Sequence, residues 1–393
     1  MTNFSEIFIK KKKDTPFRYG HPWVFSGAIE KIVGEPKDGD QVNILSSDGA
    51  FIGYGLYNSK SSIAVRLYSR LKESPVTIEF ILNKIDVAIN FRKSIYKDKI
   101  ETGAIRLFNS EGDALSGLVI DRFAGALVVQ FNSYALSLFQ NEIADHLMKL
   151  EGITDLIIKS DDSFAKLEGY IVEQRRVCGS NSKITVVENG LLYTVDLEAG
   201  QKTGFYCDQR ENRLIVSGLS DKKKVLDLFC YSGGFGLNAL KGDASSVDFV
   251  DSSAPALHLA EQNLKLNKFQ NAQFLKSDSI KFLQQISQGD YDLIIVDPPK
   301  YAVGSESVDR AAKTYISLNS LALSKLQRGG ILVSNSCSGR ISQERFMDII
   351  KYSANASGKS VQIFHTGLQP LDHPFVVPCF ETRYLKSVYM RVL

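Results

Sequence analysis

The 393-residue sequence has few cysteines, and none of them is in CxxC spacing. An odd number of scattered cysteines argues against both a disulfide framework and a structural zinc site. We therefore expect no metal centre, and a cysteine with a special role here would act as a free thiol. The five cysteines are Cys178, Cys207, Cys230, Cys337 and Cys379.

The sequence also lacks any apolar run of the roughly 18 to 20 residues that a membrane-spanning helix needs. Its first residues, MTNFSEIFIKKKK, are too polar for a signal peptide. Hydrophobic residues make up 44% of the chain and charged residues 23%, as in ordinary globular proteins that bury a sizeable core. We expect a cytoplasmic protein of two or three folded units, with no membrane partner.

A large excess of one charge is missing too, because the net charge is only +3. The whole excess lies in residues 1–75, which contain eleven basic and eight acidic residues. Charge alone favours a solvated surface over a nucleic-acid patch. Lys10–Lys13 and Arg18, however, lie near Tyr19 and Trp23, a mixture that suits phosphate contacts and base stacking. The alternative is a barrel core whose lysines protect an edge strand from pairing.

The hydrophobic pattern divides the chain into three segments. Residues 1–75 contain short β-branched and aromatic runs broken by turns, which predicts a small β-barrel or sandwich. Residues 76–183 begin with a helical pattern and then alternate strands with a helix at 134–148, which predicts a mixed α+β middle domain. Residues 184–393 are the last predicted domain. The strands expected in the first two segments are residues 8–12, 41–45, 51–57, 63–68, 118–120, 126–131 and 156–159.

The last domain has the pattern of an α/β fold. Residues 184–197 are two β-rich runs joined by Asn189-Gly190, which suits a tight two-residue hairpin. From Lys224 onward, strand, loop and helix repeat, which predicts a mostly parallel sheet with helical crossovers. Open sheets of this kind bind ligands at the carboxyl ends of their strands.

Short motifs follow four of these strands. The first, residues 230–236 (CYSGGFG), is a glycine-rich turn that lets the backbone approach a ligand closely. It departs from the G-x-G-x-x-G dinucleotide fingerprint, and Asp251 after the second strand is placed to accept hydrogen bonds from ribose hydroxyls. These two features favour a nucleoside cofactor over a phosphate-rich one.

The third and fourth motifs are also acidic. Asp278, after the third strand, can accept an adenine amino proton. Asp297 precedes Pro298 and Pro299, whose fixed φ angles present the carboxylate rigidly to a planar substrate such as a base or an amide. Each motif alone is explained equally well by a tight connection or a helix cap, but four of them at one sheet edge are specific together.

At these motifs the sequence resembles class I S-adenosylmethionine-dependent methyltransferases, and more narrowly the RlmI-type family, which methylates C5 of a cytosine in large-subunit (23S) ribosomal RNA. RYGHPWVF at residues 18–25 resembles that family's PUA RNA-binding domain, and QKTGFY, DLFCYSGGFG, DPPK, NSCSG and LDHP resemble its catalytic-domain signatures. The resemblance covers nearly the whole chain. It implies a Rossmann-like methyltransferase domain preceded by a PUA-like barrel and a linking domain, with S-adenosyl-L-methionine as cofactor and ribosomal RNA as partner. Relatives of this type suggest a homodimer.

The same resemblance implies which residues form the site. The residues implied to line the cofactor pocket are Lys202, Tyr206, Asp227, Phe229, Tyr231, Gly233, Gly234, Asp251, Ser252, Asp278, Ser279 and Asp297, the last of which also faces the substrate. The residues implied to contact the RNA are Pro298, Pro299, Lys300, Arg18 and Trp23. One departure is Tyr301, where phenylalanine is expected in many relatives, although an aromatic ring is retained.

Cys337 is the residue on which this chemistry depends. C5 of cytosine is a poor nucleophile, so it needs a covalent partner at C6 before it can attack a methyl group. Cys337 follows the strand after the one that ends in DPPK, so both motifs should reach the same rim of the sheet. Its thiolate could add to C6 while Asp297, protonated or hydrogen-bonded to the ring, supports the charge. The base that removes the C5 proton stays open between Lys300, Asp372, His373 and water.

Three alternatives remain at this point. Cys337 could be an inert buried thiol, and the DPPK motif could then orient a guanine or adenine nitrogen in RNA for N-methylation. The protein could also be a non-catalytic RNA-binding assembly factor, although the intact acidic set argues against a decayed site. A Rossmann oxidoreductase is disfavoured by the missing dinucleotide fingerprint.

Overall fold

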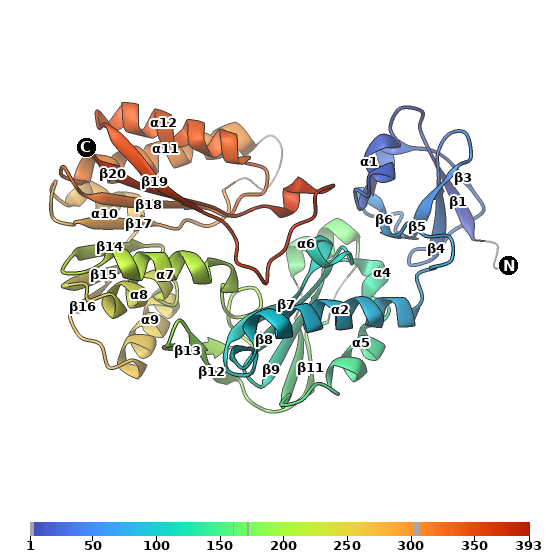
Figure 1. Ribbon diagram of the computed structural model, residues 1–393, viewed down its shortest axis with the longest axis horizontal. Coiled ribbons are helices and arrows are strands. Elements are labelled where there is room, and N and C mark those ends of the chain that lie inside the picture. Colours follow the sequence, from blue (N-terminus) through green and yellow to red (C-terminus); the bar gives the residue numbers. More distant parts are fainter. Residues whose placement is uncertain (1–3, 160, 171–172, 302–306) are drawn as a thin grey trace. The chain divides into compact units, whose positions relative to one another are not determined.

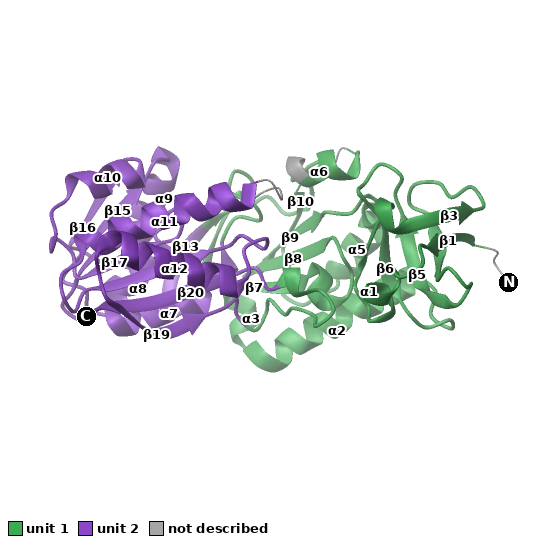
Figure 2. Ribbon diagram, turned by 90° about the horizontal axis from the view of Figure 1, so that it is seen from above, with its two compact units in different colours: residues 1–186, 195–205, 371–382 green, residues 187–194, 206–370, 383–393 purple. Residues whose placement is uncertain are grey.

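The computed structural model describes residues 4–159, 161–170, 173–301 and 307–393 (Figure 1). These residues divide into two compact units (Figure 2). The first unit comprises residues 1–186, 195–205 and 371–382, and the second comprises residues 187–194, 206–370 and 383–393. Within the described ranges, no helix has the length and apolar character needed to span a membrane. The three-part division at residues 75 and 183 stays a prediction.

A six-stranded sheet begins the first unit, in the order β2-β6-β5-β4-β1-β3. The strands are β1 (Ser5–Ile9), β2 (Trp23–Phe25), β3 (Ile29–Val33), β4 (Gln41–Leu45), β5 (Phe51–Tyr57) and β6 (Ile63–Ser69). The strand predicted at residues 8–12 is wrong in its bounds. β1 ends at Ile9 because Lys10–Lys13 form a turn in which Lys12 has a φ of 69°. β1 pairs with both β3 and β4, so these lysines do not protect an edge strand.

The first unit also contains a five-stranded sheet in the order β11-β10-β9-β8-β7. Its strands are β7 (Ala104–Asn109), β8 (Leu118–Phe123), β9 (Ala126–Phe131), β10 (Asp155–Lys159) and β11 (Arg175–Cys178). The accompanying helices are α1 (Thr15–Arg18), α2 (Ile78–Tyr96), α3 (Lys99–Thr102), α4 (Tyr134–Ser137), α5 (Gln140–Leu147) and α6 (Asp162–Glu168). The single helix predicted at 134–148 is two helices, because Phe139 leaves the helical conformation with φ −98° and ψ 16°.

The predicted hairpin at Asn189-Gly190 is confirmed. β12 (Lys183–Glu188) pairs with β13 (Leu191–Asp196) in a two-stranded sheet. Asn189 and Gly190 have φ values of 53° and 74°, the pair of positive angles that a type I′ turn requires.

The second unit contains a seven-stranded sheet in the order β16-β15-β14-β17-β18-β20-β19. Its strands are β14 (Lys224–Leu228), β15 (Ser246–Asp251), β16 (Ala272–Lys276), β17 (Leu293–Val296), β18 (Ile331–Ser336), β19 (Val361–Gly367) and β20 (Lys386–Val392). Its helices are α7 (Arg210–Leu219), α8 (Gly234–Lys241), α9 (Ala254–Leu266), α10 (Ser279–Gln285), α11 (Val308–Lys325) and α12 (Gln343–Ser357). The first five strands are parallel, and β20 runs antiparallel to both of its neighbours, β18 and β19. The expected mostly parallel sheet is therefore confirmed.

The register brings the strand ends to one edge. Leu228 at the end of β14 pairs with Val250 of β15 and with Val296 of β17, and Val296 pairs with Ser334 of β18. The central strand β17 is fully buried at every residue, so polar chemistry has no place along its length. The motifs that follow these strands consequently meet at the carboxyl edge.

The glycine-rich turn between β14 and α8 is built from left-handed residues. Phe229, Tyr231 and Gly233 have φ values of 61°, 47° and 82°. One turn into α8, a Cβ on Gly236 would lie 2.2 Å from the ring of Phe249. Glycine at 236 thus allows α8 to pack closely on β15.

Gly236→Ala should therefore destabilise the second unit by about 1–3 kcal/mol through overpacking. Gly218→Ala is the matched control, because Gly218 also lies in a helix but a Cβ there meets nothing within 4 Å. That substitution should be neutral or stabilising by about 0.5–1 kcal/mol. Calorimetric unfolding of both variants would contradict this account if Gly236→Ala were no less stable than the control.

Candidate active site

Asp251 ties the end of β15 to the glycine-rich turn. Its Oδ2 accepts the backbone N–H of Tyr231 at 3.0 Å, and its Oδ1 accepts the N–H of Ser253 at 2.9 Å. The carboxylate is only partly buried, and each oxygen can accept a second hydrogen bond. This pair of acceptor oxygens fits the two vicinal hydroxyls of a ribose.

Aromatic and small residues surround that carboxylate. The rings of Tyr206 and Tyr231 meet edge to face with centroids 5.4 Å apart. Gly233 and Gly234 are buried, and Ser252 next to Asp251 is exposed. Aromatic rings beside a carboxylate are side chains that suit a nucleoside.

Asp278 is both a helix cap and an accessible acceptor, the two roles that the sequence left open. It caps α10, because its Oδ1 accepts the N–H of Lys281 at 3.0 Å. Its side chain is nevertheless exposed, while the following Ser279 is buried. A capping carboxylate retains lone pairs that can accept an adenine amino proton.

Asp297 lies among polar groups that sequence reasoning missed. Gln209 donates from Nε2 to Asp297 Oδ1 at 3.0 Å, and Asn212 in turn donates to Gln209 Oε1 at 2.6 Å. Burial and the charge of Asp208 raise the pKa of Asp297 to about 7, against the opposing effects of Arg213 and the Gln209 hydrogen bond. At neutral pH this carboxyl group therefore carries a proton in a substantial fraction of molecules. One sequence feature could have indicated that Asp208 and Gln209 belong to the site. They follow the QKTGFY motif closely, separated from it only by Cys207.

Asp227 stabilises the glycine-rich turn through a hydrogen bond to its backbone. Its Oδ2 accepts the N–H of Gly236 at 2.8 Å, and burial raises its pKa to about 8. The nearby charges of Asp297 and Asp251 raise this pKa further. Asp227 therefore acts as a buried support of the turn, while Phe229, which follows β14, packs at the edge of the unit's core.

Cys337 and the DPPK motif do come together. Cys337 follows β18 and is partly buried, and its Sγ lies 3.9 Å from the carbonyl oxygen of Pro298. Pro299 and Lys300, which follow Pro298 in the motif, are exposed. The flanking Ser336 and Ser338 are fully buried, so only the cysteine between them is partly accessible.

Several expected site residues belong to the first unit. Lys202 is exposed and has a φ of 50°. Arg18 pairs with Asp14, with Nε 2.5 Å from Oδ2. Trp23 donates its indole N–H to Glu111 at 2.9 Å, so its polar end is already engaged. Their roles in binding stay predictions.

Asp372 and His373, two of the candidate bases, are buried in the same unit. Asp372 Oδ2 accepts the backbone N–H of Arg106 at 3.0 Å, and its Oδ1 lies 3.0 Å from His373 Nδ1. Arg92 donates to the Asp372 carbonyl at 2.8 Å. These bonds give both residues a structural role.

One group of potential metal ligands tests the expectation that the protein has no metal centre. His21, Cys379 and Glu381 place their ligand atoms within 4.8 Å of one another. His21 Nδ1, however, accepts the backbone N–H of Trp23 at 3.2 Å, so a neutral ring carries its proton on Nε2, the atom that faces Glu381. This arrangement suits a hydrogen-bonded cluster better than metal ligation.

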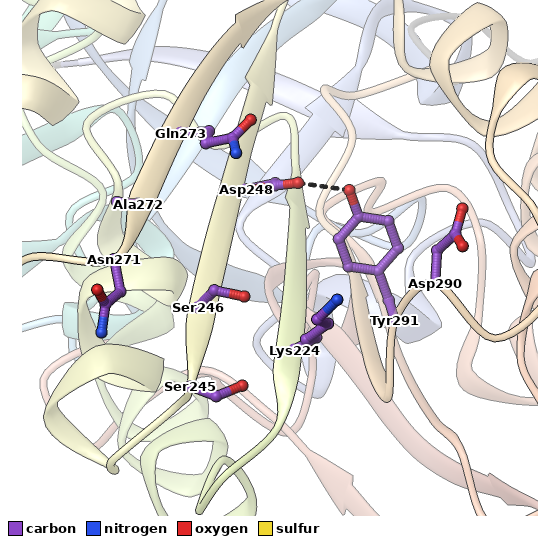
Figure 3. Close-up of a pocket in the computed structure, with 9 residues that line it drawn as sticks. All are labelled: Lys224, Ser245, Ser246, Asp248, Asn271, Ala272, Gln273, Asp290 and Tyr291. Atoms are coloured by element: carbon purple, nitrogen blue, oxygen red, sulfur yellow. Dashed lines mark hydrogen bonds between the residues drawn. The ribbon is translucent and has the colours of Figure 1, made fainter.

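A cavity of about 570 Å³ lies at the other edge of the seven-stranded sheet (Figure 3). Lys224, Ser246 and Ala272, which line it, are the first residues of β14, β15 and β16. Asp248 lies there with its Oδ2 2.5 Å from the hydroxyl of Tyr291. This cavity is thus separate from the edge where the motifs meet.

Comparison with protein families identifies the parts of the chain. Residues 7–70 match the PUA-like domain, and residues 177–350 match the S-adenosylmethionine-dependent methyltransferase family. A Streptococcus mutans protein named as a SAM-dependent methyltransferase shares the fold at a TM-score of 0.84 and 21% identity, with 98% of this chain and 100% of that one covered. A methyltransferase complexed with SAH matches at a TM-score of 0.85 and 20% identity, over 98% and 100% of the two chains. The protein is therefore a class I methyltransferase with a PUA-like domain, and S-adenosyl-L-methionine is its methyl donor.

Curated relatives give a narrower family. A protein of Aeromonas salmonicida is 36% identical over 98% of both chains, and one of Tolumonas auensis is 34% identical over 98% of this chain and 99% of its own. Both are named Ribosomal RNA large subunit methyltransferase I. The chain belongs to this family.

Asp251→Ala should weaken S-adenosylmethionine binding about 10-fold to 100-fold, because hydrogen bonds to a charged group contribute about 1.5–3 kcal/mol. Asp248→Ala is the matched control, since it removes a carboxylate from the same strand at the opposite edge of the sheet. Its dissociation constant should stay within about twofold of the parent protein. Isothermal titration of both variants measures this, and equal affinities would remove Asp251 from the cofactor site.

Proposed function

We propose that the protein methylates C5 of a cytidine in large-subunit ribosomal RNA through a covalent adduct on Cys337. The names of the family relatives supply the RNA class. The observation that carries the C5 chemistry is the position of Cys337 Sγ, 3.9 Å from the Pro298 carbonyl in the DPPK motif. The thiol thus contacts the residue that follows Asp297, whose carboxyl group can hold a proton.

Each of these groups has a defined role in the proposed reaction. The Cys337 thiolate adds to C6 of the ring, and the electron pair of the C5–C6 double bond moves toward N3. Asp297, with a pKa of about 7, can carry the proton that N3 then takes up. S-adenosylmethionine supplies the electrophilic methyl group. After C5 has been methylated, a base takes the C5 proton, the C5–C6 double bond re-forms as the thiolate leaves, and N3 returns its proton to the Asp297 carboxylate.

Burial and exposure reduce the number of candidates for the base that removes the C5 proton. Asp372 and His373 are buried, which argues against their contact with a substrate base. Lys300 is exposed and belongs to the DPPK motif, and water remains the other candidate.

N-methylation of a purine is the competing proposal. It would use Asp297 and the Pro298 carbonyl to accept the protons of an amine, and Cys337 would be structural. The thiol lies against that carbonyl, which favours the C5 reaction.

We propose that the PUA-like domain holds the RNA. Lys11, Lys12 and Lys13 are exposed in one turn, and Tyr19 is 75% exposed. Tyr19 is thus better placed to stack on a base than Trp23, whose indole N–H is bound.

Nucleoside mass spectrometry tests the proposal. Ribosomal RNA from cells that lack the gene is incubated with the protein and with S-adenosylmethionine carrying a labelled methyl group, and the label is expected in 5-methylcytidine. Cys337→Ala should lose at least about 10³-fold in rate, as nucleophile removal does elsewhere. Cys178→Ala, a thiol of the first unit, should remain active. Label in a methylated guanosine or adenosine would establish the competing reaction.

The pH dependence of single-turnover methylation tests Asp297. Its proton is present below about pH 7 and is lost as the pH rises through that value. The rate should therefore fall on the alkaline side, while thiolate formation limits it on the acid side. Asp297→Asn keeps a donor that does not titrate, so it should be slower but without the alkaline fall. An unchanged alkaline fall in this variant would assign the titration to another group.

A further inference from the structure

Lys386 is a buried lysine next to the proposed nucleophile. It is the first residue of β20, and the antiparallel register places it opposite Ser336, the residue before Cys337. Its side chain is 1% exposed. A lysine buried to this extent needs a specific role, because its charge is costly to remove from water.

Three hydrogen bonds use all the donors of its ammonium group. Nζ donates to the carbonyls of Ser338 at 2.6 Å, Ile341 at 2.7 Å and Tyr384 at 2.7 Å. Two of these carbonyls belong to the loop between Cys337 and α12. Since an ammonium has three N–H groups, all its donors are used, two of them to hold this loop and one to hold the segment before β20.

The charge of Lys386 also acts on the sulfur. Burial lowers the pKa of Lys386 to about 8, the proximity of Cys337 raises it, and Arg383 and Lys300 lower it further. The group thus remains mostly charged at pH 7. Arg340, the cation nearer in sequence to Cys337, is exposed, so its field is weakened by water and salt.

We propose that Lys386 is the positioning residue of Cys337, which clamps the nucleophile loop and stabilises the thiolate. This rests on the proposed role of Cys337 as nucleophile. The thiol proton leaves to solvent, the ammonium keeps its three protons, and the sulfur retains the electron pair that attacks C6. A fixed buried cation makes this anion available without a neighbouring histidine.

The test measures alkylation of Cys337 by iodoacetamide in the full-length protein, with peptide mass spectrometry to separate it from the other cysteines. Lys386→Met keeps an unbranched side chain, one atom shorter, and removes its charge. Its alkylation rate at pH 7 should fall about threefold to tenfold, and the rate should recover at higher pH. Arg340→Met is the matched control and should alkylate within about twofold of the parent protein.

The parent protein itself provides a second measurement. A buried cation is poorly screened, so the alkylation rate should change by less than about twofold between 50 and 500 mM salt. A several-fold fall with salt would assign the effect to an exposed cation and overturn the proposal. Unchanged or faster alkylation in Lys386→Met, in a variant that still binds S-adenosylmethionine, would also overturn it.

These outcomes are separate from those of the methylation assay. Formation of 5-methylcytidine by Cys337→Ala would end the nucleophile hypothesis whatever the alkylation rates are. An inactive Cys337→Ala together with normal alkylation in Lys386→Met would leave the proposed function standing and end only the role of Lys386.

Discussion

The parallel pairing of β14 with both β15 and β17 is the constraint on which the rest of the second unit depends. These strands are mostly buried, so most of their interior residues are apolar and the motifs with polar side chains follow their ends. Parallel strands point the same way, and the segments that follow them emerge at one edge. The glycine-rich turn, Asp251, Asp297 and Cys337 meet there because of the ladder, although they are far apart in the sequence.

The protonation of the carboxyl groups at that edge depends on how close they are to one another. Asp208, Asp227 and Asp297 lie close together in a partly dehydrated setting, and Arg213 offsets only part of their mutual repulsion. Arg213 is itself fixed by Glu188 of the β12-β13 hairpin, with bonds of 2.7 and 2.8 Å. Such a group of carboxyls cannot all be ionised, so protons remain on some of them near neutral pH. In the reaction proposed above, this proton is the one that the ring nitrogen takes up.

Local sequence patterns predicted most strands and helices, but they failed at two places where the backbone conformation changes. β4, β5 and β9 have the predicted bounds, because alternating apolar residues and turn residues mark both ends. The end of β1 was missed since the left-handed conformation of Lys12 carries no sequence signal. The break between α4 and α5 was missed for a similar reason, because Phe139 fits a helical pattern as well as it fits the break.

The sequence by itself determined the order of strands and helices and the motifs at the strand ends, since both depend on residue spacing and on the chemistry of glycine, proline and aspartate. Tertiary structure alone decided which groups surround those motifs. Gln209 reaches Asp297 from a segment 88 residues away, and Lys386 reaches the loop after Cys337 because β20 is inserted antiparallel beside β18. Neither contact follows from local spacing, because both depend on the pairing and packing of segments distant in the chain.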